Sequence, residues 1–212
     1  MTIDYYALDR IEFTHKGWRA LAFPKLSTRY VAGEGDNPEA FIIGEAPGAQ
    51  EEIMGRPFVG PAGRILRQLM EFADLRSYPR PLQGTPINCW LTNVVKFRPP
   101  KNATPSDDMI RSIRAQLRGE WRAVGYPSLI IPVGKPALSA VTGNYKISIL
   151  RAAGKCHYYT SKSTGKELAI WPMVHPSYGI RNPAIQPLLE QDWVKLAEWR
   201  ASGESWNNVA HS

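Results

Sequence analysis

Residues 41–70 read FIIGEAPGAQEEIMGRPFVGPAGRILRQLM. A short apolar run opens this stretch, and Ile65, Leu66, Leu69 and Met70 close it with the spacing of an amphipathic helix. Glycines and prolines lie between the two, on either side of an acidic cluster. Glycine lets a backbone approach a ligand closely and proline stiffens a loop. The stretch therefore predicts a strand, a rigid binding loop and a helix.

Three more apolar runs follow along the chain. Residues 90–95, 129–133 and 168–174 are mostly apolar without an alternating pattern, as 41–43 is, which is typical of strands covered on both faces. Helical patterns separate these runs, and alternating strands and helices favour a parallel sheet between helix layers. We predict an α/β fold, a three-layer α/β/α sandwich with a central four-stranded parallel sheet. It should form a single domain over 1–212.

Helix signals complete this prediction. Thr104 is the expected N-cap of a helix that has Pro105 at its first position and runs to about Ala123. A short helix is expected over 136–141, and a final one around 188–199.

Two regions lie outside this alternation. The stretch 155–170 has a glycine-containing turn between two strand-like halves and can add a hairpin. The structured core is expected over about 39–199, and residues 203–212 read as a polar tail.

Composition narrows the class of protein. In 212 residues, 43% are hydrophobic, enough for one substantial core. An excess of 26 Lys and Arg over 19 Asp and Glu gives a net charge of +7, which suits a polyanionic partner or simply keeps the protein soluble.

Residues 1–30 contain no long apolar run, so neither a signal peptide nor a membrane helix is expected. Cys89 and Cys156 are too few for a disulfide framework or a four-thiolate metal site.

Glycine or polar side chains lie in or directly after each predicted strand. Ligands in open α/β sheets bind beyond the carboxyl ends of the strands, so these residues should meet around one crevice. They supply an acid, an amide and an imidazole, none of which would be informative alone. The residues are Gly44 and Glu45, Thr92 and Asn93, Gly134, and His175 with Ser177.

Two further features of the glycine-rich stretch concern ligands. Phe58 follows Pro57 between glycines and can stack on a planar base, although an ordinary core phenylalanine would look the same. Neither G-x-G-x-x-G nor G-x-x-x-x-G-K-[ST] occurs, so we exclude a dinucleotide oxidoreductase and a P-loop NTPase.

Four segments, in this order, resemble the uracil-DNA glycosylase superfamily. They are GEAPGAQEEIMGRPFVGPAG (44–63), LTNVVKFRPP (91–100), IIPVGKPAL (130–138) and VHPSYGIRNP (174–183). The greatest similarity is to the bacterial and archaeal branch called family 4, whose members usually carry an iron–sulfur cluster. The resemblance implies an enzyme that cuts uracil from DNA.

The resemblance also implies roles by position. Phe58 would stack on the extruded uracil and Asn93 would pair with its Watson–Crick edge. His175 would hydrogen-bond the carbonyl beside the departing nitrogen, and Glu45 would position or activate water. Glu51 would crowd the C5 edge and help exclude thymine. Further substrate contacts are expected from Gly44, Ala46 and Ser177; alanine at Ala46 is normal for this branch.

Basic and exposed residues are assigned to DNA. Tyr178 or Ile180 would insert into the duplex as a wedge with Arg181 on a phosphate, although a loop packed on its own protein is an open alternative. Phosphate contacts are expected from Lys96, Arg98 and Lys101.

The sequence departs from family 4 at the cluster. Phe97 occupies the position of one of the four cluster cysteines, and Cys89 and Cys156 do not fall on the pattern. We expect no iron–sulfur cluster, no metal and no other cofactor. Phe97 is expected to pack with Trp90 and Tyr126 instead.

Three functional hypotheses remain. The first is a monofunctional uracil-DNA glycosylase, a monomer that acts on single- or double-stranded DNA in the cytoplasm of a bacterium or virus-infected cell, near the nucleoid. The second is a relative acting on another deaminated base such as hypoxanthine, and the third is a non-enzymatic DNA-binding module of a replication or repair assembly. A pure binder has no need of Glu45, Asn93 and His175 together, which argues against the third.

Overall fold

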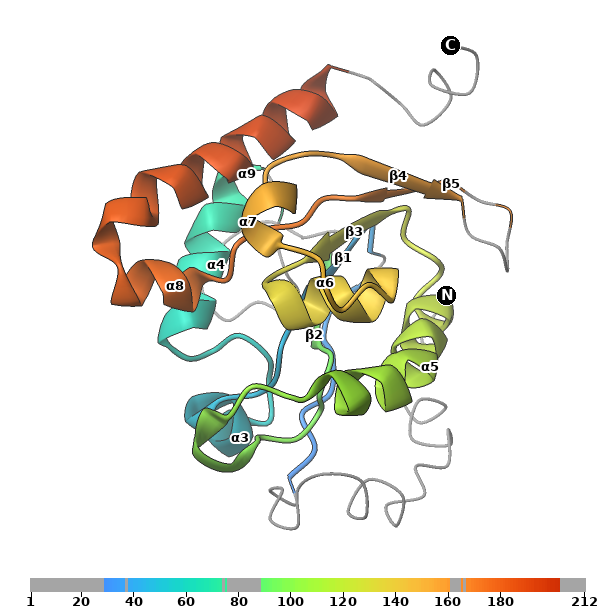
Figure 1. The fold of residues 1–212 in the computed structure, drawn as a ribbon, viewed down its shortest axis with the longest axis vertical. Helices are drawn as coiled ribbons and strands as arrows, with labels where there is room; N and C mark the ends of the chain where they lie inside the picture. The colour runs from blue at the N-terminus through green and yellow to red at the C-terminus, as the bar shows by residue number, and fades with distance from the viewer. Residues whose placement is uncertain are drawn as a thin grey trace.

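The structure, a computed structural model, describes residues 29–36, 38–73, 75, 89–160, 165 and 167–202. Its centre is a five-stranded sheet with the strand order β2-β1-β3-β5-β4 (Figure 1). The polar tail predicted at 203–212 lies outside the described residues. The strands are β1 (Ala40–Gly44), β2 (Cys89–Asn93), β3 (Leu129–Pro132), β4 (His157–Thr160) and β5 (Glu167–Ile170).

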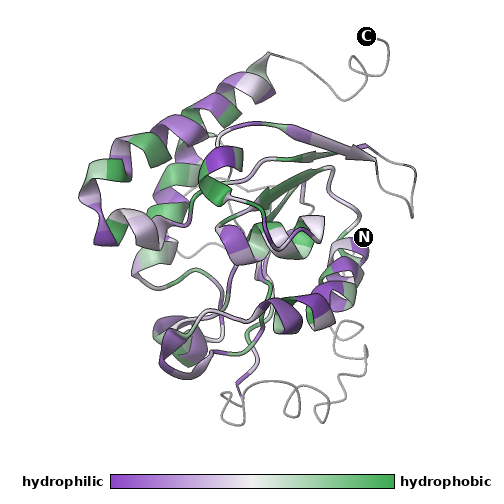
Figure 2. Cartoon of the chain, viewed as in Figure 1, coloured by the Kyte–Doolittle hydropathy of each residue, from purple (hydrophilic) through white to green (hydrophobic). Residues whose placement is uncertain are grey.

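Four of the strands are parallel, as predicted. β1 pairs in parallel with β2 and with β3, and β3 pairs in parallel with β5. The hairpin suggested for 155–170 is also present, because β4 pairs with β5 in antiparallel fashion and forms one edge of the sheet. β5 is mostly buried, whereas β4 is mostly exposed and more hydrophilic (Figure 2). The sheet is therefore mixed, with a parallel core.

Helices cover both faces of this sheet, and alternate residues of β1 serve the two faces. Ala40 and Ile42 pack in the core under α4 (Pro61–Phe72) and α9 (Gln186–Ala201). Phe41 and Ile43 pack in the core under α5 (Asp107–Ala123) and α6 (Lys135–Thr142). Burial on both faces is the reason why this strand is continuously apolar.

The start of α5 differs from its prediction. Its N-cap is Ser106, whose Oγ accepts a hydrogen bond from the backbone N–H of Met109 at 3.2 Å, and not Thr104. Asp107 and Asp108 then lie in the first turn, where a carboxylate is stabilised by the helix dipole. The short helix predicted over 136–141 is α6, which ends at Gly143 in the left-handed conformation.

A short helix that the sequence did not suggest lies inside the glycine-rich stretch. α3 (Ala49–Met54) begins after Gly48 and ends at Gly55, whose φ is 68°. The remaining short elements are α7 (Ile149–Ala152), α8 (Pro176–Arg181), and two 3₁₀ turns, Pro100–Asn102 and Pro183–Ile185. In the part of the chain that is described, no helix is both long and apolar enough to cross a membrane.

Candidate active site

A cavity of about 520 Å³ opens beyond the carboxyl ends of the parallel strands. Segments far apart in sequence form its wall: the loop after β1, α3, the start of α4, the loop after β2 and the start of α8. It collects most of the predicted catalytic and substrate residues, namely Glu45, Ala46, Glu51, Phe58, Asn93, His175 and Ser177, together with Arg181. Gly44 ends β1 beneath them.

His175 is the N-cap of α8, and its ring is held on two sides. Nδ1 accepts a hydrogen bond from the backbone N–H of Ser177 at 3.2 Å and lies 2.8 Å from Ser177 Oγ. A Cβ at Gly134 would lie 3.2 Å from Cβ of His175, so the end of β3 supports the same side chain. A backbone N–H can only donate, so Nδ1 is an acceptor. In the neutral ring the proton is therefore on Nε2, which is left as a donor.

The imidazole is neutral at physiological pH. Burial and, to a smaller extent, the charge of Arg181 lower the pKa of His175 to about 4, although Glu51 opposes the shift. A neutral imidazole with its proton on Nε2 can donate a hydrogen bond to a carbonyl without carrying a charge into the cavity. This state suits the stabilisation of an anion that forms during a reaction.

Phe58, Asn93 and the end of β1 meet closely. A Cβ on Gly44 would lie 2.4 Å from Asn93 Oδ1 and 2.5 Å from Phe58 Cζ, so only glycine allows the two side chains to come together there. Phe58 and Asn93 are both buried. Within the described residues, no group hydrogen-bonds the side-chain amide of Asn93. A ring face and an amide thus share one corner of the cavity.

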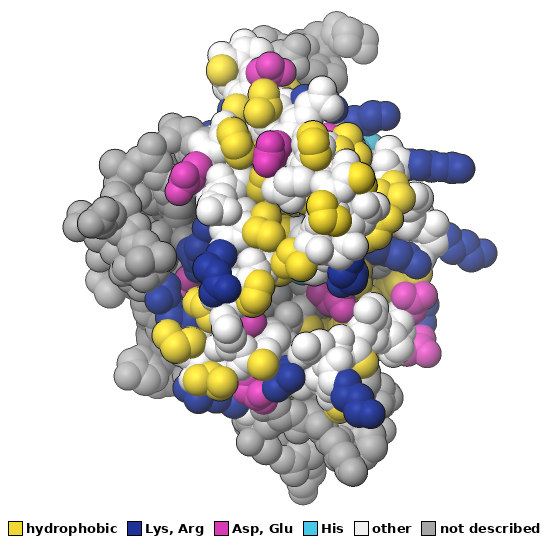
Figure 3. Space-filling model, turned by 90° about the vertical axis from the view of Figure 1, so that its left-hand side faces the viewer, with side chains coloured by type: hydrophobic (Ala, Val, Ile, Leu, Met, Phe, Trp, Pro, Cys, Tyr) yellow, Lys and Arg dark blue, Asp and Glu magenta, His cyan; other side chains and the backbone are white. Residues whose placement is uncertain are grey.

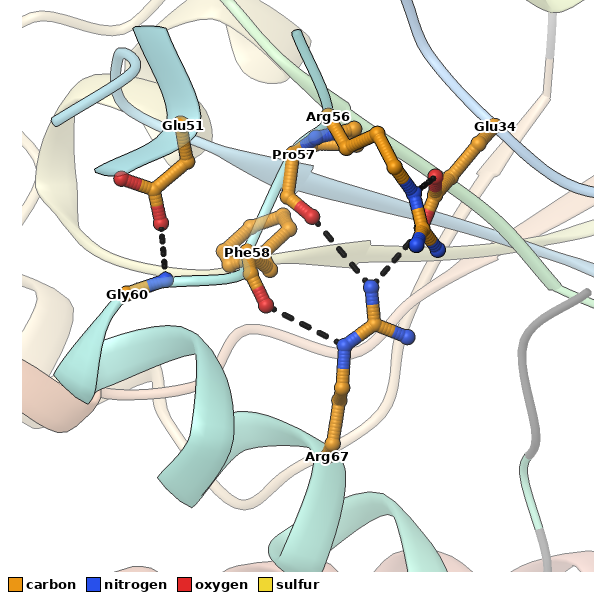
Figure 4. A network of polar contacts seen from close by, with 7 residues as sticks. All are labelled: Glu34, Glu51, Arg56, Pro57, Phe58, Gly60 and Arg67. Carbon is orange, nitrogen blue, oxygen red and sulfur yellow. Dashed lines mark hydrogen bonds and ion pairs between the residues drawn. The ribbon is translucent and has the colours of Figure 1, made fainter. Parts of the chain in front are cut away.

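Glu51 ties the two ends of the glycine-rich loop together. One carboxylate oxygen accepts from the backbone N–H of Gly60 at 2.7 Å (Figure 4), and the other accepts from that of Gly48 at 3.1 Å. The carboxylate is buried and paired with backbone, so its first role is to hold the loop's shape. Its predicted contact with the C5 edge of uracil stays a prediction.

The surroundings of Glu45 shift the pKa of its carboxyl. Burial raises the pKa of its carboxyl above 4.5, while a hydrogen bond from the Thr104 side chain and the charge of Arg181 lower it. Thr104 thus faces the cavity and not the helix backbone. Sequence reasoning missed the loop after β2 as part of the wall, which contributes Pro99, Asn102, Ala103 and Thr104.

The Glu45 setting gives a pH prediction. If the Glu45 carboxylate activates water, activity should fall as the pH drops through its raised pKa. Thr104→Val removes a hydrogen bond that stabilises the carboxylate, so the pKa rises and the acidic limb of the profile should move to higher pH. Single-turnover rates between about pH 4 and 8 would test this. An unmoved limb would show that another group titrates.

Lys96 was assigned wrongly. Its side chain is 1% exposed, and the ammonium is buried against Glu120 of α5 and the hydroxyl of Thr92. An ammonium in this position cannot reach a DNA phosphate. Lys96 is instead part of a buried polar network behind β2.

The other DNA residues are near the surface. Arg98 pairs with Glu52 of α3 at 3.0 Å, so a phosphate would compete with this carboxylate. Lys101 is exposed with a φ of 53°. Tyr178 and Ile180 are 39% and 48% exposed, as a wedge would require, but their contact with DNA stays a prediction.

One face of the molecule is mixed in character. Figure 3 shows hydrophobic side chains gathered toward the middle of this face, with Lys, Arg, Asp and Glu side chains among and around them.

The residues present do not fit an iron–sulfur cluster. The chain has two cysteines; Cys89 is buried at the start of β2, and Cys156 is partly buried and packs against the same core. No group of three or more His, Cys, Asp or Glu suited to a metal occurs in the described part of the chain. Phe97 meets Tyr30 edge-on at 5.6 Å, and Tyr126 meets Trp121 in the same way at 4.7 Å.

Comparison with known proteins places this site in a family. The model of the uracil DNA glycosylase superfamily matches residues 32–199. The chain belongs to this superfamily. A Type-4 uracil-DNA glycosylase of Saccharolobus solfataricus is 34% identical over 178 residues, 82% of this chain and 77% of the relative. The enzyme of the same name from Sulfurisphaera tokodaii is 33% identical over 175 residues, 81% of this chain and 74% of the relative. The superfamily match includes all the cavity-lining segments.

Proposed function

We propose that this protein is a monofunctional uracil-DNA glycosylase, which hydrolyses the N-glycosidic bond of uracil in DNA and leaves an abasic site. The observation that carries the proposal is that Glu45, Phe58, Asn93 and His175, from three segments far apart in sequence, line one cavity. The relatives named Type-4 uracil-DNA glycosylase support it.

Recognition would begin with a base taken out of the stack, because its reacting atoms are inaccessible inside a duplex. Phe58 would stack on the flipped uracil. The Asn93 amide can accept from N3–H and donate to O4, a bidentate pair that leaves no polar group of the base edge unsatisfied. Glu51, at the cavity wall, would oppose a methyl group at C5.

The reaction is a hydrolysis. As the bond between C1′ and N1 breaks, its electron pair moves onto the base, and Nε2–H of His175 would donate to the carbonyl on which negative charge grows. Water adds to the sugar at C1′, and the Glu45 carboxylate would accept its proton. The products are an abasic sugar and a uracil anion, which takes up the proton that the water gave to Glu45, directly or through solvent, and no covalent intermediate with the protein is required.

Release of free uracil from a labelled single-stranded oligonucleotide is the direct test. The wild type should release uracil, and Asn93→Ala should lower kcat/KM roughly 30- to 150-fold, because two hydrogen bonds worth about 1 to 1.5 kcal/mol each are lost. Duplexes with U·G and U·A pairs establish the preferred strand form. An Asn93→Ala variant as active as the wild type would contradict the assignment.

The same assay with oligonucleotides that carry other deaminated bases separates the alternative functions. Release of hypoxanthine but not uracil would indicate a changed base preference. DNA binding without release of any base would indicate a binding module.

A further inference from the structure

The backbone of Phe58 is in an unfavourable conformation. Its φ is 55°, in the left-handed region that aromatic residues rarely adopt. Such a conformation costs about 1 to 3 kcal/mol and persists only where neighbouring groups impose it. The residue that would stack on the base is therefore held in place from outside.

Arg67 of α4 contacts this backbone directly. Its Nε donates to the carbonyl of Phe58 at 3.1 Å, and its Nη2 donates to the carbonyl of Pro57 at 3.3 Å (Figure 4). The same Nη2 lies 2.8 Å from Glu34 Oε1. A planar guanidinium can serve two carbonyls and a carboxylate at once, whereas an ammonium on a flexible stem cannot reproduce that geometry.

Glu34 connects this arginine to the sheet. Its backbone pairs with Leu91 in β2 through hydrogen bonds of 2.9 Å and 2.8 Å. Its carboxylate also receives two hydrogen bonds from Arg56, at 2.7 Å and 3.1 Å. β2 ends at Asn93, two residues after Leu91. Arg67, which holds the backbone of Phe58, is thus connected through Glu34 to β2, the strand that carries Asn93.

We propose that Arg67, oriented by Glu34, is a positioning residue that fixes the ring of Phe58 beside Asn93 and so sets the width of the base slot. This rests on the proposed function for the identity of the base. Arg67 and Glu34 do not line the cavity; they act through Phe58.

The activity test is a double-mutant cycle. Arg67→Met should lower kcat/KM for uracil release about tenfold, since stacking of a base on an aromatic ring is worth about 1 to 3 kcal/mol. Arg67→Lys, which keeps the charge but loses the fork, should lie between Arg67→Met and the wild type. In a Phe58→Ala background, Arg67→Met should change the rate less than about twofold, because its effect passes through the missing ring. Arg122→Met, at an exposed position near the end of α5, is the matched control.

A second measurement does not depend on activity. With phenylalanine labelled by ¹³C, the ring signals of Phe58, one of 6 phenylalanines, are assigned from their absence in Phe58→Ala. They should shift in Arg67→Met and Arg67→Lys and stay unchanged in Arg122→Met. If the wild type releases no uracil but these signals shift, the proposed function fails and the positioning role stands. Unchanged ring signals, or equal Arg67→Met losses with and without Phe58, would overturn the positioning role.

Discussion

Replacing His175 by alanine is expected to lower kcat by about 10²- to 10³-fold, the loss typical of one preorganised donor to a developing anion. The affinity for uracil-containing DNA should change little, because the charge on the carbonyl develops only as the bond breaks. The tautomer supports this role, since the Ser177 N–H on Nδ1 leaves the proton on Nε2. Single-turnover rates and equilibrium binding to the same oligonucleotide would measure the two quantities separately.

His175→Gln is the informative control, because an amide N–H can replace part of the donor function; it should retain more activity than alanine. The pH dependence is a second check. With a His175 pKa of about 4, the ring stays neutral from about pH 5 upward, so loss of activity between pH 6 and 7 should not arise from this residue. Equal losses in binding and turnover for His175→Ala would contradict a transition-state role.

The fold and the location of the cavity could be predicted because they follow from local patterns. Strands covered on both faces need apolar side chains in both directions, and β1 has them from Ala40 to Ile43. Parallel strands place their carboxyl ends at one edge, so Asn93 at the end of β2 and His175 beyond β5 had to lie near each other.

Short helices and their caps were harder to predict. α3 has six residues, too few for a periodic apolar pattern, and it is stabilised by Glu51 binding backbone on both sides. The spacing of Gly48 and Glu51 is that of a capping box and is the signal that could have revealed it. Thr104 and Ser106 are equally good caps by composition; in the structure Thr104 lines the cavity together with Glu45, and Ser106 caps α5.

Pairs distant in sequence could not be predicted at all. Nothing near Lys96 indicates that its partner is Glu120, and nothing near Phe58 indicates that its backbone is held by an arginine paired to Glu34. Such pairs depend on which side of a loop a long side chain turns to. From the sequence, Lys96 was therefore interpreted as an exposed charge that contacts DNA, and this interpretation was wrong.

Replacing Glu120 by glutamine is expected to destabilise the fold by about 3 to 5 kcal/mol, the usual result of leaving a buried charge without its partner. Glu120 Oε1 also accepts from Trp90 Nε1 at 2.9 Å and from Thr92 Oγ1 at 2.8 Å. Glutamine retains an oxygen for these donors, so the loss reports mainly on Lys96. Urea denaturation would measure it, with Glu39→Gln as a matched control, because Glu39 is an exposed partner of Arg200 and should cost less than about 1 kcal/mol.

The sign of the pH dependence distinguishes this explanation from a simple packing defect. Burial lowers the pKa of Lys96, and Glu120 opposes that shift, so Glu120→Gln lowers the pKa further. The unfolded chain then binds more protons than the folded one between the lowered pKa and the ordinary value of about 10.4, and stability rises with pH across that window. Glu120→Gln should therefore recover part of its loss between about pH 7 and 9.

Removing both charges should recover most of the stability. In Lys96→Met with Glu120→Gln, no buried charge remains and an acceptor is still present for Trp90 and Thr92, so the loss should shrink to about 1 to 2 kcal/mol. A double variant no more stable than Glu120→Gln alone, or a Glu120→Gln deficit that grows with pH, would show that the ammonium of Lys96 is not the source of the instability. Recovery in both experiments would instead mean that Lys96 is charged inside the protein because Glu120 is there to pair with it.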